Sequence, residues 1–303
     1  MNNKDLKRYS PFRYAGNLVQ LEDLDLPVKR DTAKFYYVDG LEGNDGSSGE
    51  YPDEAFKTIA QAIAVVNARI DWTASPWATG DIIFVAAGTY AENLTSLPYG
   101  ASLIGLGHDT RDGENGVKIK PASGSPLAAD SVINSYFENI GFESVDASKA
   151  FDAAIVNNNI FMNCRFSGAP ETHNCAAAFY TSDAVSNRWI NCDFNCAAVG
   201  FDVAYVDGGD SFSHNEFVDC RVHQCTTAGI RTSTQLVGPS SLVRNTVIFG
   251  GGQTMAIGID DNSGILELSR CDITATDPVE GCRAANGCYG NGALLDITGE
   301  NGT

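Results

Sequence analysis

The sequence lacks the long apolar runs of a membrane protein. None of its 303 residues lie in an uninterrupted apolar stretch of about 18 residues, which is the shortest length that usually spans a bilayer. The first residues, MNNKDLKRYSPFRY, contain no apolar segment of the kind that a secretory signal needs. We therefore expect no membrane partner, and synthesis in a cytoplasm.

The cysteines and histidines lack the spacing of a metal site. The nine cysteines are odd in number, form no CxxC pair and show no usual zinc pattern. The four histidines share no helical or strand spacing. The stretch LEGNDGSSGEYPD lacks the alternating carboxylates of a calcium loop. We expect free thiols packed as small hydrophobic groups in a core, with no metal and no cofactor.

Positive charge is scarce and unevenly placed. The chain has 20 Lys and Arg against 38 Asp and Glu, a net charge of −18. Residues 1–34 hold seven of the basic and five of the acidic side chains, so this segment is at +2 and the remainder at −20. An acidic body argues against nucleic-acid binding. A mildly basic leader on that body is suited to docking on an acidic protein surface.

What the sequence does contain is a repeat. The segments NNIFMNCRF, NRWINCDF and NEFVDCRV each place a cysteine between a polar residue and a charged one. The equivalent positions 140, 164, 192, 220, 246 and 271 follow one another in steps of 24, 28, 28, 26 and 25 residues. A short strand that recurs at such intervals without intervening helices is typical of a solenoid of stacked parallel strands.

Each repeat predicts a strand with alternating inward and outward side chains. Met162, Cys164 and Phe166 are expected on the inner face, with Asn163 and Arg165 outside. Stacking of the repeats then gives two inward columns and one outward charged ladder. The members are Cys164, Cys192, Cys220, Thr246 and Cys271 in the first column, Phe166, Phe194, Val222, Ile248 and Ile273 in the second, and Arg165, Asp193 and Arg221 in the ladder.

A second strand recurs in AAAFYTS, AVGFDVA, TAGIRTS and AIGIDDN. Its expected inward residues are Phe179, Phe201, Ile230 and Ile259. Asp202, Arg231 and Asp260 form its outward ladder. Opposite charges on neighbouring strands attract weakly, by about 0.2–1 kcal/mol for an exposed pair, and help to fix the register.

Residues 1–34 follow neither period and predict an extended arm. The expected partner-binding residues of this arm are Arg8, Tyr9, Phe12, Arg13 and Tyr14. After it the sequence predicts a strand over 35–40, a helix that begins at Asp53 or Glu54, a strand over 80–85 and a turn over 88–90. The helix is expected to cap the first coil, and residues 80–298 leave room for about nine coils of ~25 residues.

The segments FYYVDGLEGNDG, AFKTIAQAIAVV, GDIIFVAAGTYAEN and LIGLG resemble the capped entrance of right-handed parallel β-helix proteins. This is the pectate-lyase-like superfold, of the kind found in tailed-phage virions. The resemblance covers residue 35 to about residue 300. It implies an all-β solenoid of about nine coils with an N-terminal capping helix, divided into an arm over 1–34 and a β-helix domain over 35–303. It does not fix the function, because this scaffold carries lyases, hydrolases, epimerases, adhesins and inert shells.

Carboxylates on neighbouring coils are the candidates for chemistry, because cleavage of a polysaccharide needs an acid and a base on one face. The candidates are Asp202, Asp207, Asp210, Asp260 and Asp261. A structural explanation competes, since Asp202 and Asp260 also fit a charge ladder and DGGD is typical of a turn. No motif of the lyases or hydrolases on this scaffold is present residue by residue, so no catalytic residue is assigned.

The favoured hypothesis is a non-enzymatic structural protein of a phage virion. A capsid decoration or cement protein would dock on the capsid, or on another virion protein, through residues 1–34 and project the β-helix as a homotrimer. A tailspike usually carries a C-terminal trimerising region, whereas the predicted coils run almost to residue 303. The alternatives are a tailspike-type polysaccharide depolymerase, either a lyase or a hydrolase, and an adhesin that binds a host glycan. The expected location is the virion, after synthesis in the host cytoplasm.

Overall fold

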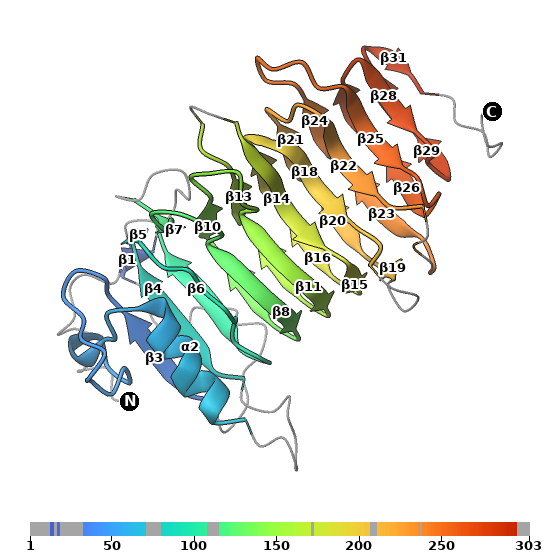
Figure 1. Cartoon of the computed structure of the whole chain (residues 1–303). Coiled ribbons are helices and arrows are strands. Elements are labelled where there is room, and N and C mark those ends of the chain that lie inside the picture. The colour runs from blue at the N-terminus through green and yellow to red at the C-terminus, as the bar shows by residue number, and fades with distance from the viewer. Residues whose placement is uncertain are drawn as a thin grey trace.

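The computed structural model describes residues 33–70, 80–107, 115–170, 173–206, 211–234, 236 and 238–295, and the backbone of residues 13–14 and 17–18. In this part the chain winds into a right-handed parallel solenoid of about seven turns with little helix (Figure 1). Three parallel sheets run along its length. The all-β parallel β-helix predicted from the repeat is therefore confirmed.

We name the sheets by their strands. Sheet 1 consists of β3 (Phe35–Val38), β4 (Ile82–Ala86), β6 (Ser102–Leu106), β9 (Tyr136–Glu138), β12 (Ile160–Met162), β16 (Arg188–Ile190), β20 (Glu216–Val218), β23 (Ser241–Arg244), β26 (Leu266–Ser269) and β29 (Ala284–Asn286). Sheet 2 consists of β5 (Gly88–Tyr90), β7 (Val117–Ile119), β10 (Ile140–Glu143), β13 (Arg165–Ser167), β17 (Asp193–Asn195), β21 (Arg221–His223), β24 (Val247–Phe249), β27 (Asp272–Thr274), β30 (Tyr289–Gly290) and β31 (Ala293–Leu294). Sheet 3 consists of β8 (Leu127–Ile133), β11 (Phe151–Asn157), β14 (Cys175–Thr181), β15 (Asp183–Val185), β18 (Ala197–Val203), β19 (Phe212–Ser213), β22 (Ala228–Thr232), β25 (Ile257–Asp261) and β28 (Asp277–Glu280).

A complete turn contributes to sheet 3, then sheet 1, then sheet 2. The first complete turn among the described residues is β8, β9 and β10, and the last is β28, β29 and β30. Between residues 33 and 126, the described strands belong to sheets 1 and 2 only. The expectation of about nine coils over residues 80–298 is therefore not confirmed. The first two windings, β4 with β5 and β6 with β7, have no described strand in sheet 3. Residues 88–90, expected as a turn, form β5 of sheet 2.

The cysteine of each repeat lies at a corner between two sheets. β12 ends at Met162 and β13 begins at Arg165, and Asn163 between them has a φ of 53°. Asn and Asp accept this left-handed conformation more readily than other residues that carry a Cβ. The same corner recurs with positive φ at Asn139, Asn191, Asp219, Asn245 and Arg270. The turn thus favours the Asn or Asp that stands at five of these six corners.

The corner also corrects one predicted side-chain direction. Cys164 and Phe166 are buried in the interior, as expected. Met162 instead belongs to the outer face of sheet 1, where it packs against a second hydrophobic cluster. The prediction applied strand alternation across a bend, and alternation holds only within a continuous strand.

The predicted inward columns are confirmed by the register and the burial. Phe166, Phe194, Val222, Ile248 and Ile273 are direct partners on successive strands of sheet 2, and Phe179, Phe201, Ile230 and Ile259 are partners in sheet 3. All nine cysteines are free thiols, and eight of them are buried. The cysteine column therefore serves as packing, as expected.

Aromatic rings stack along each sheet in the middle of the interior. Phe179 lies between Phe151 and Phe201, with ring centroids 4.2 and 4.6 Å apart. It also meets the edge of Trp189 from sheet 1 at 5.5 Å and 86°. Each stacked or edge-on pair contributes about 0.5–1.5 kcal/mol beyond the burial of its area. These contacts join the three sheets into one core.

A buried asparagine ladder follows the corner between sheets 3 and 1. Asn187 Nδ2 donates to Val156 O at 2.6 Å and to Asn215 Oδ1 at 3.0 Å. Its Oδ1 accepts from the backbone N–H of Asn159 at 3.0 Å. Asn159, Asn187 and Asn215 are 0–1% exposed, and each bonds to the next turn. The ladder satisfies backbone groups that the bend leaves without sheet partners.

The helix α2 (Ile59–Ala68) begins later than the sequence predicts. Thr58 is its N-cap, and its hydroxyl accepts from the N–H of Gln61 at 3.2 Å. The expected start at Asp53 or Glu54 falls instead in a short 3-10 helix, η2 (Pro52–Glu54). The apolar face of α2 joins the core at the N-terminal end of the solenoid, next to β3 and β4 (Figure 1). That α2 closes this end as a cap stays a prediction.

Most of the predicted arm lies outside the described residues, including Arg8, Tyr9 and Phe12. Arg13 and Tyr14 form β1 (Arg13–Tyr14), which pairs antiparallel with β2 (Asn17–Leu18). The division between an arm over 1–34 and a β-helix over 35–303 stays a prediction. No helix of the described residues is long and apolar enough to span a membrane.

Candidate functional site

A polar network lies on the outer face of sheet 2. Arg165, Asp193 and His223 point outward from three successive strands, β13, β17 and β21. His223 Nε2 lies 2.9 Å from Asp193 Oδ1. Arg165 Nη2 donates to Asn195 Oδ1 at 3.2 Å, and its Nε lies 4.0 Å from Asp193 Oδ2. Arg165 is 8% and Asn195 0% exposed, whereas Asp193 and His223 are partly exposed, so the network lies at the edge of the solvent.

This network replaces the predicted ladder of solvated ion pairs. Arg165, Asp193 and Arg221 have the expected register. Asp193, however, lies closer to His223 than to Arg165, because diagonal neighbours on adjacent strands are within reach of a long side chain. Arg221 instead places its guanidinium 5.2 Å from the ring centroid of Phe249.

The surroundings of Asp193 favour its charged form. Burial raises the pKa of this carboxyl, but contacts with His223 and Asn195 and the positive charge of Arg165 outweigh burial and lower the pKa below its ordinary value of 3.8. A similar balance holds at the start of the sheet. Burial raises the pKa of Glu143, but Lys120 at 2.5 Å and Lys118 at 3.3 Å lower it overall.

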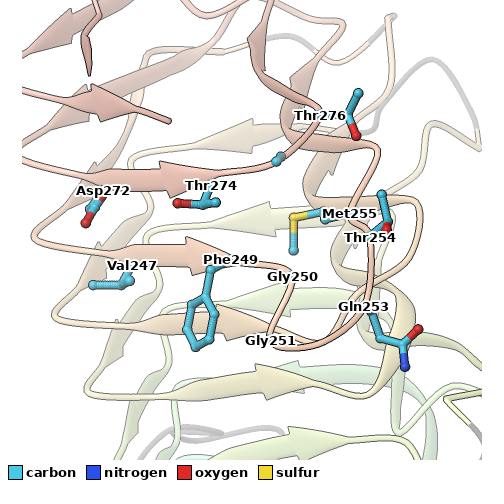
Figure 2. Close-up of a pocket in the computed structure, with 11 residues that line it drawn as sticks. Val247, Phe249, Gly250, Gly251, Gln253, Thr254, Met255, Asp272, Thr274 and Thr276 are labelled. Carbon is cyan, nitrogen blue, oxygen red and sulfur yellow. The ribbon is translucent and has the colours of Figure 1, made fainter. Parts of the chain in front are cut away.

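A hollow of about 660 Å³ adjoins the network on the same face. Figure 2 shows it between β24, β27 and the loop that follows Phe249. Its lining residues are Val247, Phe249, Gly250, Gly251, Gln253, Thr254, Met255, Asp272, Thr274, Ala275 and Thr276. The hollow therefore combines apolar side chains with hydroxyls and one carboxylate.

Phe249 connects the hollow to the network. Its ring stacks on His223 with centroids 5.3 Å apart and planes 11° from parallel. Its partner on β27 is the small residue Thr274, and the ring is half-buried at the edge of the hollow. Arg221 is exposed, and no carboxylate among the described residues makes an ion pair with it. An open aromatic face beside an unpaired guanidinium can receive a ring that carries an anionic group.

Of the predicted carboxylates, Asp202 and Asp260 lie on the outer face of sheet 3, away from this hollow. Arg231 stands between them in the register. It donates to both oxygens of Asp202, at 2.9 and 2.8 Å. The ladder register is confirmed. Asp202 is buried rather than solvated, at 8% exposure.

Asp261 has a structural environment. It is 1% exposed and accepts from the hydroxyl of Thr232 at 2.6 Å, from Ser263 at 2.9 Å and from the N–H of Leu266 at 2.7 Å. Asp207 and Asp210 lie outside the described residues. No group of three His, Cys, Asp or Glu in the described part of the chain is arranged to hold a metal.

Similar proteins were found by structure alone. No family model and no curated protein matches the sequence. Three solved structures share the winding of this chain. They are a rhamnogalacturonan lyase (15% identity, 80% of this chain and 69% of that chain, TM-score 0.55), the pectate lyase Pel9A (14%, 91% and 81%, 0.58) and the pectin methylesterase from Aspergillus niger (14%, 89% and 92%, 0.59).

The fold is the pectate-lyase-like β-helix. At 14–15% identity the likeness covers the fold and not the activity. Within this β-helix, the sequence did not single out His223 and Phe249 as site residues. A signal was present, because each directly follows an inward residue, Val222 or Ile248, whose place in a column was predicted. One more step along the strand puts both on the outer face, one above the other.

Proposed function

We propose that this protein is a non-enzymatic β-helix that binds an acidic polysaccharide along the outer face of sheet 2. The observation that carries the proposal is the open ring of Phe249 beside the unpaired guanidinium of Arg221, at the edge of the hollow. Sugar rings pack on aromatic faces, and a guanidinium binds a carboxylate through two parallel hydrogen bonds. The chain thus offers one group for the sugar ring and one for its charge.

The arrangement of the predicted carboxylates favours binding without cleavage. The guanidinium of Arg231 neutralises Asp202, and the buried Asp261 accepts from three donors. Neither of these groups is placed to transfer a proton to a substrate. Asp193, which is in the network, is held by His223 and is not among the residues that line the hollow.

The proteins of similar fold are named for pectin, pectate and rhamnogalacturonan, so oligogalacturonate is the first probe. We expect it to bind in calorimetry, and a neutral glucan of equal length not to bind. Phe249→Ala and Arg221→Gln should each weaken binding at least tenfold. Arg188→Gln, on the outer face of sheet 1 and paired with Glu216, is the matched control and should bind normally.

Product release separates binding from catalysis. The same oligosaccharides are incubated with the protein and assayed for new reducing ends, unsaturated products and released methanol. We expect none of these products. Release that Asp202→Ala or Asp260→Ala abolishes, with an unchanged melting temperature, would establish a depolymerase instead. If Phe249→Ala binds oligogalacturonate as tightly as the parent, the hollow is not the glycan-binding site.

Attachment to a phage virion, as a capsid decoration protein, is the second candidate. It is favoured by the charge contrast between the first 34 residues, at +2, and the remainder, at −20. A homotrimer anchored on the capsid by its basic segment would present three copies of sheet 2 to a glycan. A variant that lacks residues 1–34 should be lost from the particles on washing. If the particles keep as much of the variant as of the parent, this segment is not the anchor.

A further inference from the structure

The outer face of sheet 1 is apolar over its first strands, although it points away from the core. Tyr37, Phe84 and Ile104 are partners on β3, β4 and β6, and Phe35 and Ile82 form the column beside them. Tyr37, Phe84, Ile104 and Ile82, with Ala55 and Tyr136, form a hydrophobic cluster that is separate from the main core. We call this cluster the outer apolar patch.

The outer apolar patch is covered. Ile82, Phe84 and Ile104 are only 1%, 3% and 4% exposed. Apart from Ala55, the described hydrophobic members of the cluster all come from sheet 1 itself. Side chains that stand side by side on one sheet face leave their tips open. Burial to this degree therefore requires a further layer outside the sheet.

We propose that residues 1–32 of the same chain supply that layer. The chain enters the patch directly after this segment, since the N–H of Lys34 donates to Asp81 Oδ1 at 2.8 Å and the N–H of Ile82 to Lys34 O at 2.9 Å. Thirty-two residues can reach about 100 Å when extended, whereas four strands of a sheet span only ~15–20 Å. The segment carries apolar side chains at Tyr9, Phe12, Tyr14, Leu18, Val19 and Leu21.

The size of the patch fits a short segment better than a second β-helix. Its last members are Ile160 and Met162 on β12. On the following strands charged residues join the outer face, with Glu216 held 3.1 Å from Arg188 and 3.9 Å from Arg244. They stand beside Ile190, Val218 and Leu242. A second solenoid of equal length would have to cover this charged part as well.

Photo-crosslinking of the full chain tests the proposal. A benzoylphenylalanine at position 12 is irradiated at a dilution where the protein is monomeric, and the attachment site is mapped by mass spectrometry. We expect attachment to residues 35–38, 82–86, 102–106 or 136–138. The same probe at position 289, where Tyr289 is 50% exposed on β30 of the last complete turn, is the control and should not reach these strands. Attachment elsewhere, or none, overturns the proposal.

Two further measurements identify the occupant. In a mixture of isotopically light and heavy protein, crosslinks should stay within one chain, and mixed light–heavy products would assign the patch to a second copy. A chain of residues 33–303 should bind a hydrophobic dye, and the peptide 1–32 should displace the dye. The peptide with Phe12→Ser and Tyr14→Ser should not. If the 33–303 chain folds but binds no more dye than the full chain, the proposal is also contradicted. Both measurements are independent of glycan binding.

Discussion

The asparagine ladder shows how single residues set the winding of the chain. Replacing Asn187 by Ala removes a donor to Val156 O and Asn215, and an acceptor for the N–H of Asn159. Buried polar groups left without partners cost about 1–3 kcal/mol each. We expect Asn187→Ala to lower the free energy of unfolding by about 2–4 kcal/mol in urea titrations.

The control for this variant is Asn191→Gly. Asn191 is exposed, and its φ of 51° is one that glycine adopts without strain. Its side chain makes one exposed hydrogen bond, to Asn163. We expect a change below about 1 kcal/mol. Equal losses in the two variants would mean that the buried ladder adds nothing beyond the turn conformation.

The Asp193 network predicts a particular pH dependence of stability. The pKa of Asp193 is lower in the folded protein than the ordinary 3.8. The unfolded chain therefore takes up a proton first, and the stability contributed by this carboxylate is complete above about pH 4 and is lost as the pH falls through the folded-state pKa. Asp193→Asn should be less stable than the parent at pH 6, and the gap should narrow at pH 3.

Urea unfolding at the two pH values measures this gap. Glu42→Gln, in the exposed loop after β3, is the control and should follow the parent at both. A gap that stays constant from pH 6 to pH 3 would show that Asp193 contributes by packing and not by charge.

At the scale of the strand, three stacked glycines determine how closely the turns approach. Gly200, Gly229 and Gly258 lie on β18, β22 and β25. A Cβ on Gly229 would lie 2.5 Å from Gly258 O and 2.6 Å from Ile248 Cγ2. Gly258 O is backbone of the next turn and cannot move without shifting it, and Ile248 is fully buried in the core. We therefore expect Gly229→Ala to cost about 1–3 kcal/mol.

Thermal unfolding of the glycine variants checks this expectation. Gly46→Ala is the control, because its nearest neighbour would be Asn44 Oδ1 at 3.4 Å in an exposed loop. It should leave the melting temperature unchanged. A Gly229→Ala variant as stable as the parent would mean that the turns can separate at this column.

The elements differ in how far the sequence could predict them. The cysteine and phenylalanine columns were correct because their spacing is a direct consequence of stacking, and every turn repeats it. The corner at Asn163 was missed, because a bend of one residue leaves the apolar pattern almost intact. The same bend places Met162 on the outer face instead of the inner face. The stacking of Phe249 on His223 could be predicted only from the register of β21 and β24, and no sequence motif marks this pair.

At the scale of the whole molecule, each turn of a solenoid contacts mainly its two neighbours, so turns can be removed from one end. Deleting residues 277–303 removes the last complete turn and keeps every residue that lines the hollow. Deleting residues 251–303 removes most of that lining and leaves β22, β23 and β24 as the final turn. Both shortened chains should keep the circular dichroism of a β-helix and melt at lower temperature than the parent.

Binding should separate the two deletions. The chain that ends at residue 276 should bind oligogalacturonate with an affinity within about threefold of the parent, because sheet 2 is intact through Thr274. The chain that ends at residue 250 should lose this binding, because Phe249 then lacks the part of the hollow that residues 251–276 form. Calorimetry on both folded chains decides the matter. If the shorter chain binds as well as the longer one, the glycan lies on another part of the β-helix. If neither folds, the turns form one cooperative unit rather than a stack of neighbours.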